Sequence, residues 1–145
     1  MKHPQSLAEQ LYYHFATENL KNIKDYGCCI FVLLWCLGIE PEDTDAIMLV
    51  DDLITQGDIK KDCTVLWAKA IKALTGREMK SIDFLEVKHI EAIKERTPVR
   101  YDYQKKSHWV GVENGKIAFN PLKQSRCVEF GKATTQRVIH LQGEK

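Results

Sequence analysis

Several signatures of specialised proteins are missing from this sequence. It has no CxxC pair and no ladder of cysteines and histidines, so neither a zinc site nor a disulfide framework is expected. Its 21 lysines and arginines are balanced by 20 aspartates and glutamates, and basic residues form no long cluster, which argues against a nucleic-acid partner. We therefore predict a protein without a metal or other cofactor.

Long hydrophobic runs are also missing. The longest apolar run, residues 28–37, has only about half the length of a membrane span. The polar residues 1–5 lead directly into a patterned helix, which is not the pattern of a signal peptide. Free thiols, which the odd number of 5 cysteines favours, suit a reducing compartment. We expect a cytoplasmic protein with no membrane partner.

The pattern of apolar residues changes from helical to strand-like along the chain. Four segments show helical spacing besides the apolar run: residues 6–20, 45–56, 64–75 and 87–95. Four later segments have the alternation of strands: residues 98–103, 108–112, 116–120 and 137–142. Residues 79–84 could form a short extended piece. Helices followed by antiparallel strands indicate an α+β fold, and 145 residues with 44% hydrophobic content suffice for a single domain over residues 1–145.

The apolar run is the segment around which we expect the fold to be organised. Every side chain in residues 30–37 is apolar, and a helix that is apolar on all sides must be surrounded by protein, so this should be the central helix, ended by Gly38. Cys28 and Cys29 stand at its N-terminus, behind Gly27. The positive end of the helix dipole favours a thiolate there, and the thiolate is a nucleophile. Core packing is the alternative role for these two thiols. It is the role expected of the other cysteines, Cys36, Cys63 and Cys127.

A thiol nucleophile needs a base and a third group that orients the base. Among the five histidines, His108 suits this role best, because it opens a predicted strand and precedes Trp109, which could shield it from water. Asn120 ends the next predicted strand, directly before Pro121, and its amide oxygen could accept a hydrogen bond from the imidazole. A purely structural role for the histidine, and an ordinary turn at Asn-Pro, are the alternatives.

The turn between these two strands decides whether His108 and Asn120 meet. Asn114-Gly115 suits either a two-residue type I′ turn or a three-residue turn that includes Glu113. The two-residue turn places His108 and Asn120 on opposite faces of the sheet. The three-residue turn places them directly opposite each other, with Cβ atoms about 5 Å apart. A catalytic pair therefore predicts the three-residue turn.

Attack of a thiolate on a carbonyl also requires donors for the oxyanion. A backbone N–H at the start of the central helix is one candidate. The side-chain amide of Asn22, which precedes Cys28 by six residues and lies in the loop predicted over residues 22–27, is predicted as the other.

These motifs together resemble those of the papain-like cysteine peptidases. Tyr26-Gly27-Cys28-Cys29 leads into an apolar helix, and Thr97-Pro98-Val99 comes next along the chain. Residues 107–112 then form a His-aromatic-valine strand, and Phe119-Asn120-Pro121 follows it. The likeness is greatest to the C39-like branch, which includes the bacterial peptidases that cut double-glycine leader peptides, and it covers about residues 22–121. The resemblance implies a papain-like α+β fold in which N-terminal helices, one of them bearing the cysteine, pack on a C-terminal antiparallel sheet.

The resemblance also implies roles for individual residues. Cys28 would be the nucleophile, His108 the general base and acid, and Asn120 the orienting group of a hydrolase acting on a peptide or protein substrate. Asn22 departs from the family, which usually has an oxyanion-hole glutamine of longer reach at this place. Cys29 replaces the usual small residue and is an alternative nucleophile, although Cys28 is preferred because it directly follows Gly27.

Two other functions fit the same residues. The first is a binding module that kept the fold and lost turnover, which the shorter Asn22 favours. The second is a non-catalytic protein whose paired cysteines are packed or redox-sensitive. The sequence carries no signal for a particular substrate or oligomeric state.

Overall fold

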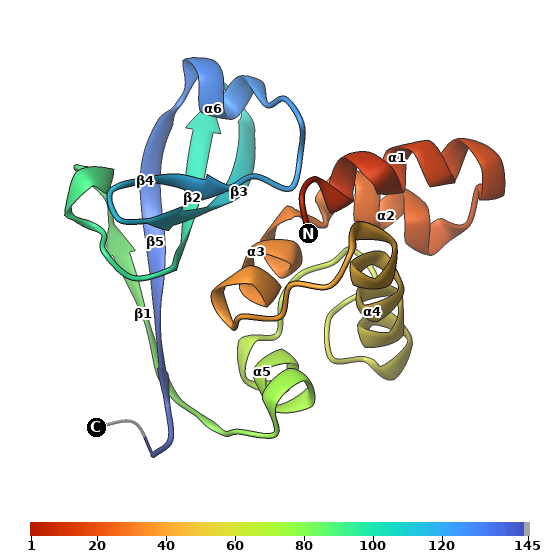
Figure 1. Cartoon of the computed structure of the whole chain (residues 1–145), viewed down its shortest axis with the longest axis horizontal. Coiled ribbons are helices and arrows are strands. Elements are labelled where there is room, and N and C mark those ends of the chain that lie inside the picture. The colour runs from red at the N-terminus through yellow and green to blue at the C-terminus, as the bar shows by residue number, and fades with distance from the viewer. Residues whose placement is uncertain (144–145) are drawn as a thin grey trace.

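A computed structural model describes residues 1–143 as an α+β structure. Its helices are α1 (Pro4–Phe15), α2 (Glu18–Tyr26), α3 (Cys28–Cys36), α4 (Asp43–Gln56), α5 (Trp67–Thr75) and α6 (Arg126–Phe130). Its strands are β1 (Met79–Glu86), β2 (Thr97–Tyr103), β3 (Lys106–Glu113), β4 (Lys116–Phe119) and β5 (Lys132–Leu141). The strands form one antiparallel sheet in the order β1-β5-β2-β3-β4. In Figure 1 the sheet occupies one half of the molecule and α1–α5 the other, with α3 between them.

The predicted central helix is confirmed. α3 is buried from Ile30 to Trp35, and Gly38 follows it with a left-handed φ of 76°. It lies close against β3 at Gly111, where an added Cβ would come within 2.4 Å of the Trp35 ring. Glycine at this position therefore allows the helix and the sheet to touch.

The predicted helix over residues 6–20 is wrong, because two helices occupy this region. α1 ends at Phe15, and Ala16 takes a left-handed φ of 49°. Thr17 then starts α2, since its hydroxyl accepts a hydrogen bond from the Leu20 N–H at 3.2 Å.

The loop expected before the central helix is also absent, because α2 continues to Tyr26. Asn22 is therefore a helical residue. Gly27 joins α2 directly to α3, and an added Cβ at Gly27 would lie 2.5 Å from the Ile23 carbonyl oxygen. The junction places the N-terminus of α3, with Cys28 and Cys29, one residue after the end of another helix.

The observed strands match the predicted ones more closely than residues 87–95 match the helix predicted there. β2, β3 and β4 match their predictions within two residues, residues 79–84 are extended as part of β1, and β5 begins at Lys132 rather than at residue 137. The helix predicted over 87–95 is wrong, because only a 3-10 turn, Ile90–Ala92, forms there. The residues after this turn instead accept hydrogen bonds from the turn between β3 and β4. The Asn114 N–H donates to the Lys94 oxygen at 2.9 Å, and the Gly115 N–H donates to the Ile93 oxygen at 2.7 Å. The short helix α6 is not apparent in the sequence.

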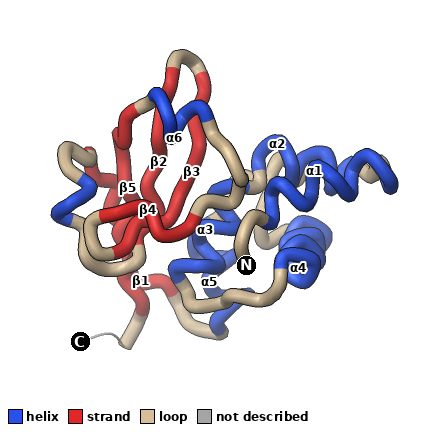
Figure 2. The backbone as a smooth tube through the Cα atoms, turned by 45° about the horizontal axis from the view of Figure 1, so that its top comes forward, coloured by secondary structure: helices blue, strands red, loops and turns tan. Residues whose placement is uncertain are grey.

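The sheet has an apolar core on each face. The larger core surrounds α3 and includes side chains of α4 and α5. The smaller one contains Val99, Val110, Val112 and Cys127, so α6 covers part of the face opposite to α3. Figure 2 shows α6 crossing near the ends of β2 and β3, away from the other helices. Within residues 1–143, no helix has both the length and the apolar character needed to cross a membrane.

Candidate functional site

His108 and Asn120 are joined by a hydrogen bond. The distance between His108 Nε2 and Asn120 Oδ1 is 2.7 Å, and His108 is buried. The backbone N–H of Leu122 also donates to Asn120 Oδ1, at 3.0 Å. Because a backbone N–H can only donate, this contact identifies the Asn120 atom as the oxygen. His108 Nε2 must then carry the proton, which leaves the lone pair of Nδ1 free to accept another proton.

The predicted three-residue turn is wrong, although the pair that it was meant to bring together exists. Asn114 and Gly115 have positive φ values of 53° and 79°, and Glu113 pairs with Lys116, so the turn has two residues. Such a turn alone would place Asn120 on the face opposite to His108. One step further along, however, the register shifts from Val112↔Ile117 to Gly111↔Phe119.

This shift is a bulge that leaves Ala118 as an extra residue in β4. An extra residue reverses the alternation of side chains beyond it, and Asn120 therefore falls on the face of His108. The pairing expected from a three-residue turn thus arises from a bulge in the strand.

The first residues of the chain hold the segment that carries Asn120. His3 Nδ1 lies 3.0 Å from the Asn120 backbone oxygen, and the Gln5 N–H donates to the Pro121 oxygen at 3.1 Å. This position of Asn120 thus depends on contacts with residues at the opposite end of the sequence.

Cys28 lies beside the strand that carries His108. Its thiol is buried, and the backbone N–H of Trp109, the residue after His108, lies close enough to the sulfur to stabilise a negative charge on it. The backbone N–H groups of Cys28 and Cys29 also lie close enough to the sulfur to stabilise a negative charge on it. Among residues 1–143, no hydrogen bond joins the thiol directly to the His108 ring. The thiol therefore lies against β3 at the residue next to the candidate base.

The thiolate expected at the start of α3 is not favoured in the resting protein. Burial raises the pKa of the Cys28 thiol, and this effect exceeds that of the surrounding N–H donors. Burial also lowers the pKa of His108, against the opposing effect of its hydrogen bond to Asn120. At neutral pH the pair therefore consists of a neutral thiol and a neutral imidazole.

Cys29 points to a different environment. Burial raises the pKa of its thiol well above the usual value. The positive charge of Arg137 on β5 opposes this change. Cys29 packs against the core around α3, whereas the Trp109 N–H contacts Cys28. The geometry thus distinguishes the two cysteines and favours Cys28 as the candidate nucleophile.

Both cysteines line an open hollow of about 490 Å³, together with Tyr26 and Trp109. Cys63, which the sequence suggested as a packing residue, also lines it and has a left-handed φ of 64°. A larger hollow of about 800 Å³ lies beside residues 86–97 and is lined by none of the predicted site residues. The smaller hollow is the candidate substrate site because both candidate nucleophiles line it; His108 and Asn120 do not.

The structure does not place Asn22 in this site. Asn22 lies within α2, does not line the hollow, and its side chain forms no hydrogen bond with another residue of the described range. Because α2 is helical where a loop was expected, Asn22 is held on the helix surface. The N–H groups beside the Cys28 sulfur belong instead to the backbone.

The site thus combines a hydrogen-bonded His108–Asn120 pair with a buried thiol on the neighbouring helix. The sequence identified these three residues, but not Trp109 as a donor to the thiol or Cys63 as part of the wall. A signal for Trp109 was present, because it directly follows His108. No family model, curated protein or solved structure matches this chain.

Proposed function

We propose that this protein is a cysteine-dependent hydrolase of peptide or amide bonds, with Cys28 as nucleophile, His108 as general base and acid, and Asn120 as the group that orients His108. The observation that carries the proposal is the 2.7 Å contact from His108 Nε2 to Asn120 Oδ1. It fixes the imidazole in the tautomer whose Nδ1 can take the proton of a thiol. The placement of a cysteine at the start of a buried helix and a His-Asn pair on a sheet supports a papain-like arrangement. Five free thiols suit a reducing, cytoplasmic location.

The neutral state of the pair determines how the reaction would begin. A substrate carbonyl enters the hollow beside Cys28, and His108 Nδ1 takes the thiol proton as the sulfur attacks the carbonyl carbon. The backbone N–H groups of Cys28 and Cys29, which lie near the sulfur, serve as donors to the oxyanion that forms. His108 then gives its proton to the leaving amine, and a water molecule activated by His108 hydrolyses the thioester.

The test is hydrolysis of a mixed peptide pool, with new N-termini identified by mass spectrometry. Cys28→Ser and His108→Ala should each reduce cleavage by about 100-fold or more, because each removes a group that acts in the transition state. Cys29→Ser should retain most of the activity, and Cys36→Ser is the matched control at the other end of α3. Full activity in Cys28→Ser would contradict the proposal.

A binding module without turnover is the second candidate. Two observations favour it: Asn22 lies away from the hollow, and burial raises the pKa of Cys28. In that case peptides would bind to the wild-type protein and to Cys28→Ser with equal affinity, and neither protein would cleave them.

A further inference from the structure

Arg137 on β5 lies between two aromatic rings. Its guanidinium carbon is 4.0 Å from the centre of the Phe84 ring and 5.0 Å from the centre of the Trp109 ring. Phe84 is its partner across the β1–β5 ladder, and Trp109 comes from β3. Three strands therefore hold this guanidinium in one place.

The charge of Arg137 has no anionic partner within the described residues. Its Nη1 donates only to neutral oxygens, at 2.8 Å to Thr135 Oγ1 and 3.3 Å to the Gln136 carbonyl. Its Nε is buried and makes no hydrogen bond. Arg137 is partly buried, and a partly buried cation without a counter-charge would be stabilised by an anion beside it.

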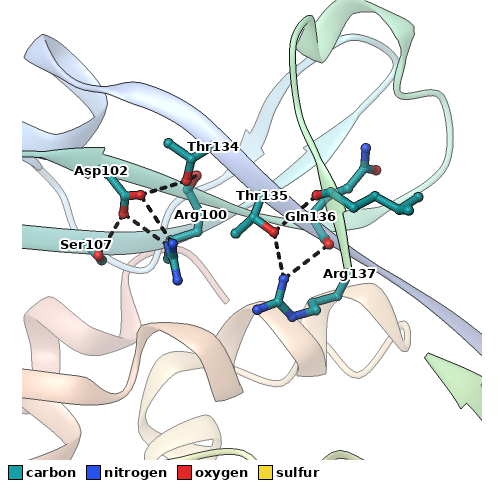
Figure 3. Close-up of polar contacts among 8 residues, drawn as sticks. Arg100, Asp102, Ser107, Thr134, Thr135, Gln136 and Arg137 are labelled. Carbon is teal, nitrogen blue, oxygen red and sulfur yellow. Dashed lines mark hydrogen bonds and ion pairs between the residues drawn. The ribbon is translucent and has the colours of Figure 1, made fainter. Parts of the chain in front are cut away.

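Arg100 increases this excess of positive charge. Burial lowers the pKa of Arg137, and the guanidinium of Arg100 is close enough to lower it further. The carboxylate of Asp102 lies 3.1 Å from Arg100 and also accepts hydrogen bonds from Ser107 and Thr134, each at 2.7 Å. Figure 3 shows both guanidinium groups on the same side of the sheet, facing the helices. Asp102 thus neutralises Arg100, and no carboxylate of the described residues pairs with Arg137.

Arg137 does not itself line the candidate substrate site but contacts it through Trp109. Trp109, which stacks on Arg137, lines the hollow with Cys28 and Cys29. Arg137 also lies near enough to Cys29 for each charge to affect the other's pKa. An anionic group held by Arg137 would consequently lie beside the thiols.

We propose that Arg137, assisted by Arg100, binds a carboxylate of the substrate next to the bond that is cleaved. The guanidinium fork suits a carboxylate, which can accept two parallel N–H bonds from it. The carboxylate can be an acidic side chain or the C-terminus of a peptide. That this carboxylate belongs to a substrate rests on the proposed hydrolase function. The carboxylate-binding site itself rests only on the surroundings of Arg137.

Titration of the ¹⁵N-labelled protein with matched small probes tests the site without requiring turnover. One pair of probes is N-acetylalanine and its uncharged amide, which represent a chain end. The other pair is the α-amides of N-acetylglutamate and N-acetylglutamine, which represent a side chain. The readout is the Nε–Hε resonance of Arg137.

At least one carboxylate probe should bind about tenfold more tightly than its neutral match and shift this resonance, because a charge-assisted hydrogen bond replaces a neutral one. The pair that discriminates identifies the source of the carboxylate. Equal affinities within both pairs, or a preference without a shift at Arg137, would overturn the proposal.

Variants provide a second measurement. Arg137→Gln should abolish the preference, and Arg137→Lys should keep part of it, because lysine retains the charge but loses the fork. Arg126→Gln, at an exposed arginine on α6, should leave the preference unchanged. If Arg137→Gln does not fold, the wild-type titration decides alone. Carboxylate binding without peptide cleavage would refute the hydrolase function and support the carboxylate site. Peptide cleavage without a preference for carboxylates would support the hydrolase function and refute the carboxylate site.

Discussion

His108 is the residue whose environment most directly controls the proposed chemistry. Burial lowers its pKa from the ordinary value of 6.5, while the hydrogen bond to Asn120 opposes that change. Burial also keeps Cys28 protonated by raising its pKa. Proton transfer would therefore accompany attack on the substrate rather than precede it. The sequence suggested the opposite, because the helix dipole can be read from a sequence but the cost of desolvation depends on the surrounding chain.

The pH dependence of activity should follow His108. We expect kcat/KM to rise with pH through a pKa below 6.5 and to have reached its plateau at pH 7. Asn120→Ala should move this acidic limb to lower pH, because the lost hydrogen bond is the interaction that raises the pKa of His108. A pH–rate profile of both proteins checks this expectation. A limb that moves upward in the variant would contradict the assigned role of Asn120.

The same pKa change predicts the pH dependence of stability. The folded pKa of His108 lies below the unfolded value of 6.5, so the unfolded chain binds more protons as the pH falls below 6.5. The contribution of His108 to the free energy of unfolding should therefore be complete above pH 6.5 and be lost as the pH falls through the folded pKa. Urea denaturation of the wild-type protein and His108→Gln between pH 4 and 8 measures it. Parallel curves for the two proteins would exclude this contribution.

At the level of elements, the bulge in β4 positions the orienting group. The two-residue turn at Asn114-Gly115 fixes one register, and Ala118 changes it before Asn120. Turn preferences can be read from Asn-Gly, but nothing in the residues Ile117-Ala118 marks a bulge. This is why the sequence predicted the correct partners from an incorrect turn.

Deletion of Ala118 should restore the uninterrupted register and turn Asn120 to the opposite face of the sheet. The His108–Asn120 hydrogen bond should then be lost, and peptide cleavage should fall to the level of Asn120→Ala. Ala118→Ser is the matched control, because it keeps the extra residue at this exposed position. The ¹⁵N resonances of the His108 ring report the hydrogen bond directly. An unchanged ring spectrum in the deletion variant would show that the bulge does not set this pairing.

In the whole molecule, Arg96 connects the helical half to the sheet. It stacks on Trp35 with 4.4 Å between the guanidinium carbon and the ring centre, and its Nη1 donates to the Trp35 oxygen at 2.8 Å. It also forms ion pairs with Glu40 at 3.1 Å and Glu113 at 3.3 Å. These carboxylates are partly exposed, so most of the stabilisation should come from the stacking and from the bond to Trp35.

Arg96→Ala should accordingly lower the free energy of unfolding by about 2 kcal/mol. Arg96→Met, which keeps apolar contact with Trp35, should lose less. Arg126→Ala at an exposed arginine should change the free energy by less than about 0.5 kcal/mol. Chemical denaturation followed by tryptophan fluorescence compares the variants. Equal losses in Arg96→Ala and Arg126→Ala would contradict a connecting role.

The whole fold also shows which features local sequence patterns can predict. α3 and β2–β4 were predicted because their apolar patterns are strong over their own length. The helical position of Asn22 and the loop at 87–95 were not, since Thr17 and the β3–β4 turn determine them from outside the segment. The surroundings of Arg137 were equally hidden, because Phe84, Trp109 and Arg137 meet only when three strands have assembled.

The contact of His3 with Asn120 spans 117 positions of the sequence. An affinity tag fused ahead of His3, or removal of residues 1–5, would therefore disturb a group that is remote in sequence but adjacent in space. A preparation altered in this way could lose the alignment of the imidazole while its core stayed intact. Assays of this protein should consequently compare tags placed at either end before any absence of turnover is attributed to the site itself.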